Sequence, residues 1–161
     1  MRLNNWKLER DAEGIAWATL NVADSAANTL GAAVMAELDL VLDQLTLRPP
    51  TGLVIRSGKA AGFIAGANIE EFTRIDSAED ARALVARGWT LFERLARATY
   101  PTLALIRGHC MGGGLELALA CRYRIAVNDD KTRVGFPEVN LGIFPGFGGT
   151  GRSIRQAGPV A

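Results

Sequence analysis

The amino-acid sequence predicts a single α/β domain whose helices pack on a sheet. Short apolar segments of strand length alternate along the chain with segments whose apolar residues recur at helical spacing. The order is strand, helix, strand, helix, strand, helix, strand, which favours right-handed crossovers wherever the strands run parallel. With 161 residues, of which 48% are hydrophobic and 22% charged, the chain can bury a core of domain size.

The first part of the chain predicts a hairpin followed by a helix. Residues 6–9 and 15–21 are its two strands, and residues 11–14 supply the turn. Residues 28–47 then form a helix, with Asn28 or Thr29 as the expected cap and two prolines after it as the stop. The apolar positions of this helix are Leu30, Val34, Leu38, Val41, Leu42 and Leu45.

The middle of the chain predicts a strand, a loop and two helices. Residues 53–55 form a buried strand, residues 63–68 an apolar loop of small side chains, and residues 69–74 a short helix. Ser77 begins a long helix to about Thr99, because the acidic residues in its first turn suit the helix dipole.

The last part of the chain continues the alternation. Residues 103–106 predict a buried strand, residues 112–120 a helix, residues 123–127 a strand, and residues 133–136 a short strand after an Asn-Asp-Asp turn. Residues 150–156 resemble a basic helix, after which nothing closes a domain. We therefore expect residues 1–161 to be the incomplete N-terminal core of one domain.

Charge and cysteine content exclude several classes of function. The net charge of +1 gives no electrostatic basis for binding nucleic acid or an anionic membrane. The two cysteines, Cys110 and Cys121, are too few for a disulfide framework and fit a reduced, cytoplasmic protein. The sequence shows neither an apolar signal-peptide region nor a run of about 18 apolar residues, so we expect no membrane span.

Glu116 is the first candidate for chemistry, because it follows a glycine triplet inside an otherwise apolar helix. An N–H group of the glycine turn, at the free start of that helix, could hold a developing oxyanion. Two alternatives stay open. The glycines also suit tight packing of helix on sheet, and a lone glutamate in a helix is commonly solvated.

Glu138 is the second candidate, although a glutamate after Phe136-Pro137 could also be a helix cap or a first-turn acid. If both carboxylates converge above the glycine turn, they could share acid and base work on one water. Partial burial there would raise the pKa of such a carboxyl from about 4.3, which suits proton transfer near neutrality.

Two further segments are glycine-rich, and His109 is a further residue with a reactive side chain. Residues 62–68 could let a ligand lie on the backbone, with the Ala67 N–H as a second oxyanion donor, or could be a tight apolar loop. Residues 146–151 fit G-x-G-x-x-G, but no clear strand leads into them and no acidic partner follows, so dinucleotide binding is excluded. His109 has no partners for a nucleophilic triad, and no metal-ligand spacing occurs.

Three segments together resemble the crotonase, or enoyl-CoA hydratase/isomerase, family. They are residues 63–69 (Phe-Ile-Ala-Gly-Ala-Asn-Ile), 109–116 (His-Cys-Met-Gly-Gly-Gly-Leu-Glu) and 137–146 (Pro-Glu-Val-Asn-Leu-Gly-Ile-Phe-Pro-Gly). The 22-residue offset from Glu116 to Glu138 further resembles the hydratase part of multifunctional fatty-acid-oxidation α-subunits, in which a 3-hydroxyacyl-CoA dehydrogenase part follows. One departure is Glu70, where the family often has a lysine.

The resemblance implies a crotonase-like spiral of β-β-α units, truncated here before the C-terminal helices. It implies that Glu138 gives a proton to C2 and Glu116 acts as the base on water, while the Ala67 and Gly113 N–H groups form the oxyanion hole. The substrate-binding residues that it implies are Ala65, Gly66, Asn68 and Gly146. A coenzyme A thioester would be the substrate, with no separate cofactor and no metal.

The activity that follows from the resemblance is hydration of 2-enoyl-CoA to 3-hydroxyacyl-CoA in fatty-acid β-oxidation. A Δ3-Δ2 enoyl-CoA isomerase, which needs one proton-shuttling carboxylate, is an alternative, as is a non-catalytic acyl-CoA-binding module. The expected partners are the acyl-CoA substrate and, in the full-length protein, further copies in a homotrimer or a fatty-acid-oxidation complex.

Overall fold

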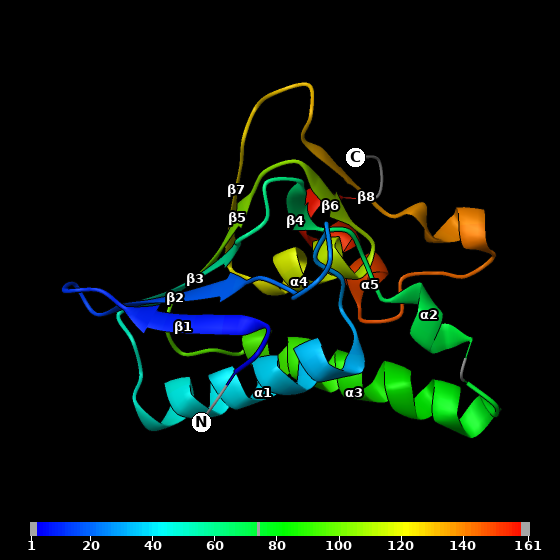
Figure 1. The fold of residues 1–161 in the computed structure, drawn as a ribbon, viewed down its shortest axis with the longest axis horizontal. Coiled ribbons are helices and arrows are strands. Elements are labelled where there is room, and N and C mark those ends of the chain that lie inside the picture. Colours follow the sequence, from blue (N-terminus) through cyan, green and yellow to red (C-terminus); the bar gives the residue numbers. More distant parts are fainter. Residues whose placement is uncertain (1–2, 74, 159–161) are drawn as a thin grey trace.

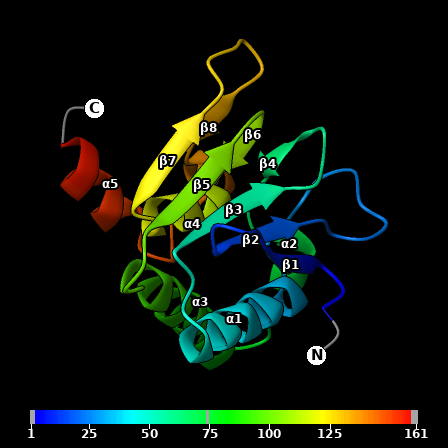
Figure 2. The same cartoon turned by 90° about the vertical axis from the view of Figure 1, so that its left-hand side faces the viewer.

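The computed structural model describes residues 3–73 and 75–158 and arranges their strands in two sheets. The larger sheet has the order β1-β2-β3-β5-β7, and the smaller has the order β4-β6-β8 (Figures 1 and 2). The strands of the larger sheet are β1 Trp6–Arg10, β2 Ile15–Leu20, β3 Gly52–Ser57, β5 Thr102–Ile106 and β7 Tyr123–Ala126. Those of the smaller sheet are β4 Gly62–Ile64, β6 His109–Met111 and β8 Arg133–Gly135.

The chain passes three times from the larger sheet to the smaller one and then into helical structure. β3 leads to β4, β5 to β6 and β7 to β8; among the strand pairs of the described residues, β1 and β2 are antiparallel and the others are parallel. The helical segments are α1 Ala32–Leu47, α2 Ile69–Phe72, α3 Ala78–Ala96, α4 Gly113–Ala120, the 3₁₀ turn η1 Pro137–Leu141, and α5 Gly149–Ala157. This repetition is the predicted spiral of β-β-α units.

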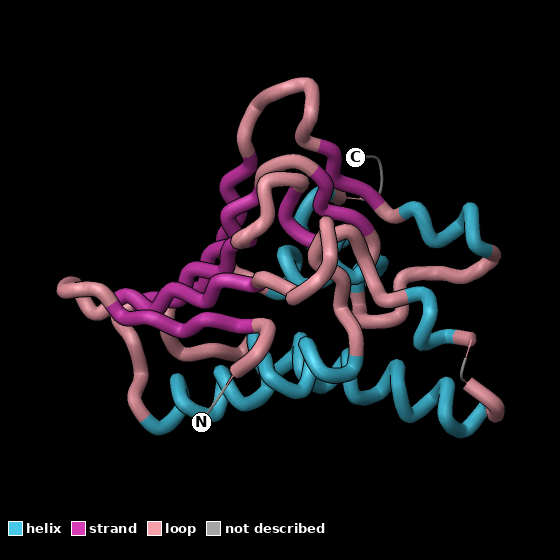
Figure 3. Tube along the Cα trace, viewed as in Figure 1, coloured by secondary structure: helices cyan, strands magenta, loops and turns pink. Residues whose placement is uncertain are grey.

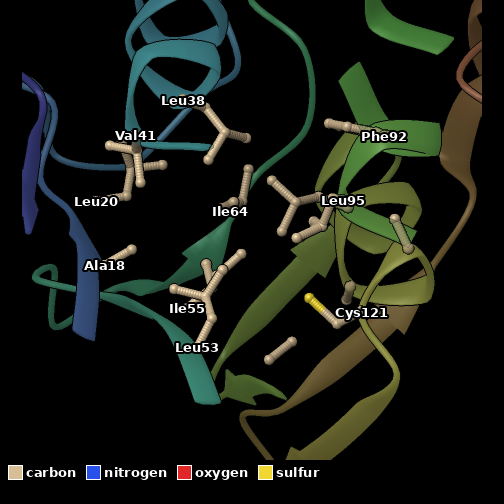
Figure 4. Packing of buried hydrophobic residues seen from close by; sticks show 14 of the residues in the cluster. Ala18, Leu20, Leu38, Val41, Leu53, Ile55, Ile64, Phe92, Leu95 and Cys121 are labelled. Atoms are coloured by element: carbon tan, nitrogen blue, oxygen red, sulfur yellow. The ribbon is translucent and has the colours of Figure 1, made fainter. Parts of the chain in front are cut away.

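The described helices lie on one side of the larger sheet, and the core fills the space between them (Figure 3). Val41 of α1 lies next to Leu20 of β2, whereas Leu38 of α1 and Leu95 of α3 point toward Ile64 of β4, with Phe92 of α3 beside them (Figure 4). These four side chains of α1 and α3 are almost completely buried. Burial of such apolar surface is the main term that holds the helices on the sheet.

Helix α3 confirms one sequence prediction in detail. Its N-cap is Ser77, whose hydroxyl accepts a hydrogen bond from the Asp80 N–H at 3.0 Å. Helix α2 ends at Phe72, with Thr73 as its C-cap; Arg74, the predicted last residue of that helix, lies outside the described residues.

The predicted cap of α1 is wrong. The helix begins at Ala32, and the Ala32 N–H donates at 2.8 Å to the carboxylate of Glu71, a residue of α2. Asn28 is instead buried in the core. Its amide donates to the Leu20 carbonyl and the Ser57 hydroxyl, and its side-chain oxygen accepts from the Val22 N–H. Asn28 therefore bonds to polar groups next to the ends of two strands, β2 and β3.

The prediction of a loop over residues 63–68 is wrong at its start. Gly62–Ile64 form β4, which pairs with β6 and through it with β8. Strands of three residues are too short to show an alternating pattern, so neither β4 nor β6 was foreseen.

Candidate active site

The two candidate glutamates are both buried, which contradicts the alternative of solvated surface acids. Glu116, on α4, is 2% exposed, and Glu138, on η1, is 8% exposed. Glu138 faces the glycine turn that precedes α4, because a Cβ at Gly112 would lie only 2.8 Å from Glu138 Oε1. The Glu116 carboxylate faces the turn before α5, and the Glu138 carboxylate is near enough to raise its pKa. The chain thus brings two buried carboxylates close together.

Glu116 is held by one of its two oxygens. The N–H groups of Phe147 and Gly149 each donate to Glu116 Oε1 at 2.8 Å. Among the described residues no donor contacts Oε2, which leaves that oxygen available to a ligand or water. Gly149 is required here, because a Cβ at that position would lie 2.7 Å from the Glu116 Cγ.

Burial raises the pKa of Glu116 above its ordinary value, mainly because the charged form loses its hydration. The two backbone N–H groups and the guanidinium of Arg152 act in the opposite direction, and the nearby Glu138 carboxylate adds to the rise. A carboxyl group whose pKa is raised toward neutrality is suited to proton transfer.

Glu138 presents an oxygen without a partner. Its Oε2 is buried and, within the part of the chain that the structure describes, has no hydrogen-bond partner. An unpaired buried carboxylate oxygen is costly, and in native proteins such atoms commonly mark a functional site or a bound water. The N-cap of η1 is Phe136, and Glu138 lies in the first turn, as the alternative of a first-turn acid predicts.

Ala67 and Gly113, the candidate oxyanion donors, lie side by side. A Cβ at Gly113 would be 3.7 Å from the Ala67 nitrogen. Leu30 bridges the residues on either side of Ala67, because its N–H donates to the Gly66 carbonyl and its carbonyl accepts from the Asn68 N–H. Neither the Ala67 nor the Gly113 N–H donates to another described residue. The two N–H groups are therefore free to serve one acceptor.

The four predicted substrate-binding residues are dispersed around this centre. Ala65 is exposed and Gly66 buried, and they flank Ala67 on the segment after β4. The Asn68 side chain accepts from the Glu70 N–H and caps α2. Gly146 packs near α3 and lies three residues before α5.

A cavity of about 530 Å³ extends from Ala67 between α1 and α3. Much of its wall is apolar and is formed by Leu30, Met35, Leu84, Leu91 and Phe147. Neither glutamate lines it; the cavity reaches the site at Ala67 and at Phe147, whose N–H donates to Glu116.

Sequence analysis missed one charged residue of the site. Arg152 of α5 is 8% exposed, and its guanidinium donates to the Phe147 carbonyl at 2.5 Å. Nothing in the basic run from residue 150 to 156 distinguishes this arginine from its solvent-exposed neighbour Arg155.

In residues 3–73 and 75–158, no three His, Cys, Asp or Glu side chains are grouped so as to hold a metal ion. Over the same residues, no helix combines the length and apolarity needed to cross a bilayer. Burial raises the pKa of Cys110 and of Cys121 to about 12, so both thiols are protonated at neutral pH.

Comparisons with known proteins agree with this geometry. Residues 10–161 match the family model described as enoyl-CoA hydratase/isomerase. The chain is 46% identical over 151 residues to the fatty acid oxidation complex subunit alpha of Aliivibrio fischeri, covering 92% of this chain and 22% of that protein. It is 44% identical over 154 residues to the protein of the same name from Vibrio campbellii, covering 95% and 22%.

Solved structures show the same fold. The enoyl-CoA hydratase from Bacillus anthracis superposes with a TM-score of 0.85 at 30% identity, covering 97% of this chain and 59% of that one. AtuE from Pseudomonas aeruginosa superposes with a TM-score of 0.84 at 32% identity, covering 96% and 59%. The chain thus spans about a fifth of the curated relatives' length and somewhat over half of these two solved chains.

Proposed function

Because this chain belongs to the enoyl-CoA hydratase/isomerase family, we propose that it hydrates a 2-enoyl-CoA thioester to the 3-hydroxyacyl-CoA. The observation that supports this reaction best is the pair of buried carboxylates, Glu116 and Glu138, which lie near enough for one to shift the pKa of the other. Each has an oxygen that accepts no hydrogen bond from a described residue, as a shared water would require.

The thioester carbonyl would lie between the Ala67 and Gly113 N–H groups. Addition of water at C3 moves electrons toward this carbonyl and creates an enolate oxygen, so donors that are already in place stabilise the transition state without reorganising. Removal of one such donor typically costs about 3 kcal/mol of transition-state stabilisation.

The water would lie between the two carboxylates. Glu116 takes one proton from it through Oε2, the oxygen of the water bonds to C3, and Glu138 delivers a proton to C2. A proton then passes from Glu116 to Glu138 and restores both groups for the next turnover. The raised pKa of Glu116 supports this exchange, because the protonated form is then more accessible than in an ordinary glutamate.

The cavity between α1 and α3 would take the acyl chain. It begins at Ala67, one of the two proposed oxyanion donors, and its apolar walls suit a hydrocarbon. Since the curated relatives are named as subunits of the fatty acid oxidation complex, we further propose a role in cytoplasmic β-oxidation, within such a complex or a homotrimer.

Glu138→Gln and Glu116→Gln test the proposal, with the exposed Glu79→Gln as the matched control. Hydration is followed as the loss of conjugated enoyl-thioester absorbance when a short-chain 2-enoyl-CoA is added. We expect both site variants to lose roughly 100-fold or more in kcat, and Glu79→Gln to match the wild type. Full hydration by Glu138→Gln would overturn the assignment of roles.

Two further measurements separate the alternative functions. Conversion of a 3-enoyl-CoA to the 2-enoyl isomer, without hydration, would identify an isomerase that uses one carboxylate. Binding of acyl-CoA by the wild type without turnover of either substrate would identify a non-catalytic binding module.

A further inference from the structure

Arg152 is the only lysine or arginine that is buried among the residues the structure describes. Its guanidinium makes a 2.6 Å ion pair with Glu93 Oε1 of α3 and lies 5.7 Å from the centre of the Trp89 ring. The same group donates to the Phe147 carbonyl at 2.5 Å. A buried cation is unfavourable unless it is paired and hydrogen-bonded in this way, so its position calls for an explanation.

The turn of residues 147–149 connects Arg152 to Glu116. On one side, the Phe147 carbonyl accepts from the guanidinium, and the Gly148 carbonyl accepts from the Arg152 N–H at 3.0 Å. On the other side, the Phe147 and Gly149 N–H groups both donate to Glu116 Oε1. Gly148 has a φ of 97°, a left-handed conformation that glycine adopts without strain and that allows the turn to face both ways.

We propose that Arg152 is a positioning residue: anchored by Glu93, it fixes the 147–149 turn so that Glu116 is held through Oε1 and keeps Oε2 for the reacting water. The catalytic part of this inference rests on the proposed hydratase function. The geometric part, a coupling between Arg152 and the Glu116 carboxyl, does not depend on it.

A purely structural role is the main alternative, because the Arg152–Glu93 ion pair also joins α5 to α3. The charged groups that act on the Glu116 carboxyl are Glu138 from η1 and Arg152 from α5, and the latter stabilises its charged form. Loss of the arginine should therefore raise the pKa of Glu116 in either role. The two roles differ in Glu93→Gln, which keeps the positive charge: a positioning role predicts a lower kcat with KM unchanged, whereas a tether between helices predicts lower stability with kcat unchanged.

The test compares Arg152→Met with Arg155→Met, an exposed arginine on the same helix, in the protein as it is naturally produced. The Glu116 carboxyl is titrated by NMR of ¹³C-labelled glutamate, and Glu116→Gln assigns its signal. For Arg152→Met we expect the Glu116 carboxyl to titrate at higher pH than in the wild type. We also expect kcat for hydration to fall roughly 10- to 100-fold, as for other residues that orient reacting groups, while KM stays near the wild-type value. Arg155→Met should match the wild type in the Glu116 titration, in kcat and in KM.

Glu93→Gln keeps Arg152 and removes the carboxylate of the ion pair. This variant therefore tests the positioning role even if Arg152→Met does not fold. It should lower kcat in the same direction with KM unchanged. An unchanged Glu116 titration in Arg152→Met, or an unchanged kcat in Glu93→Gln, would overturn the proposal. If the wild type does not hydrate 2-enoyl-CoA at all, the proposed function fails, and the titration alone decides the coupling.

Discussion

Replacement of Gly112 by alanine tests whether the glycine turn exists to admit the Glu138 carboxylate. Gly112 has a φ of 51° and a ψ of −124°, a conformation that L-residues rarely adopt. A Cβ at this position would lie 2.8 Å from Glu138 Oε1. The substitution therefore introduces backbone strain and a clash at the same time.

The backbone strain should lower the stability of the protein, whereas the clash with Glu138 should lower its kcat. A strained backbone of this kind costs about 1–3 kcal/mol, which lowers the free energy of unfolding. The clash involves the far end of a flexible side chain, so the carboxylate can retreat by about 0.6 Å, from 2.8 Å to the 3.4 Å at which ordinary contact begins. Since a misplacement of about 1 Å can cost roughly 100-fold in rate, we expect kcat to fall roughly 10- to 100-fold.

Gly142→Ala is the matched control, because Gly142 also has a positive φ, 70°, but no atom within 4 Å of its Cβ position. It should lose about 1–2 kcal/mol of stability and keep its kcat. Stability is measured by urea denaturation and kcat by the enoyl-thioester absorbance assay. If Gly112→Ala keeps wild-type kcat while both variants lose similar stability, the turn is a packing feature and our reasoning about Glu138 is refuted.

Two further substitutions probe buried polar groups. Burial raises the pKa of Glu116, so its ionisation opposes folding: the native state is favoured below the unfolded pKa, and this advantage is lost as the pH rises through the folded pKa. We therefore expect Glu116→Gln to gain stability over the wild type as the pH rises from acid to neutral; urea midpoints that differ by a constant amount at every pH would contradict this. Asn28→Ala should lose about 1–3 kcal/mol in the same assay, because it leaves the Val22 N–H without its partner and removes one of the donors to the Leu20 carbonyl, which keeps the Gly58 N–H; a loss below 1 kcal/mol would show that water replaces the amide.

The features that the sequence predicts correctly depend on residues close together in the chain. Ser77 was identified as a helix start because a cap and its acidic first turn lie within four residues. The glycine turn before Glu116 was identified because three consecutive glycines are recognisable in isolation. Short-range signals also predict the order of the elements, the apolar faces of the helices and the two candidate glutamates. Composition and spacing within one segment are enough to predict each of them.

The remaining features depend on residues far apart in the sequence. Asn28 reaches β2 and β3, the Glu71 carboxylate caps α1 from 39 residues away, and Arg152 pairs with Glu93 across 59 residues. By itself the sequence determined which carboxylates and glycines were available for chemistry and on which elements they lie. Only the tertiary structure decided that both carboxylates are buried, that Glu116 is held through Oε1, and that Glu138 Oε2 has no partner among the described residues, because burial and hydrogen bonding depend on neighbours that the chain brings together only when it folds.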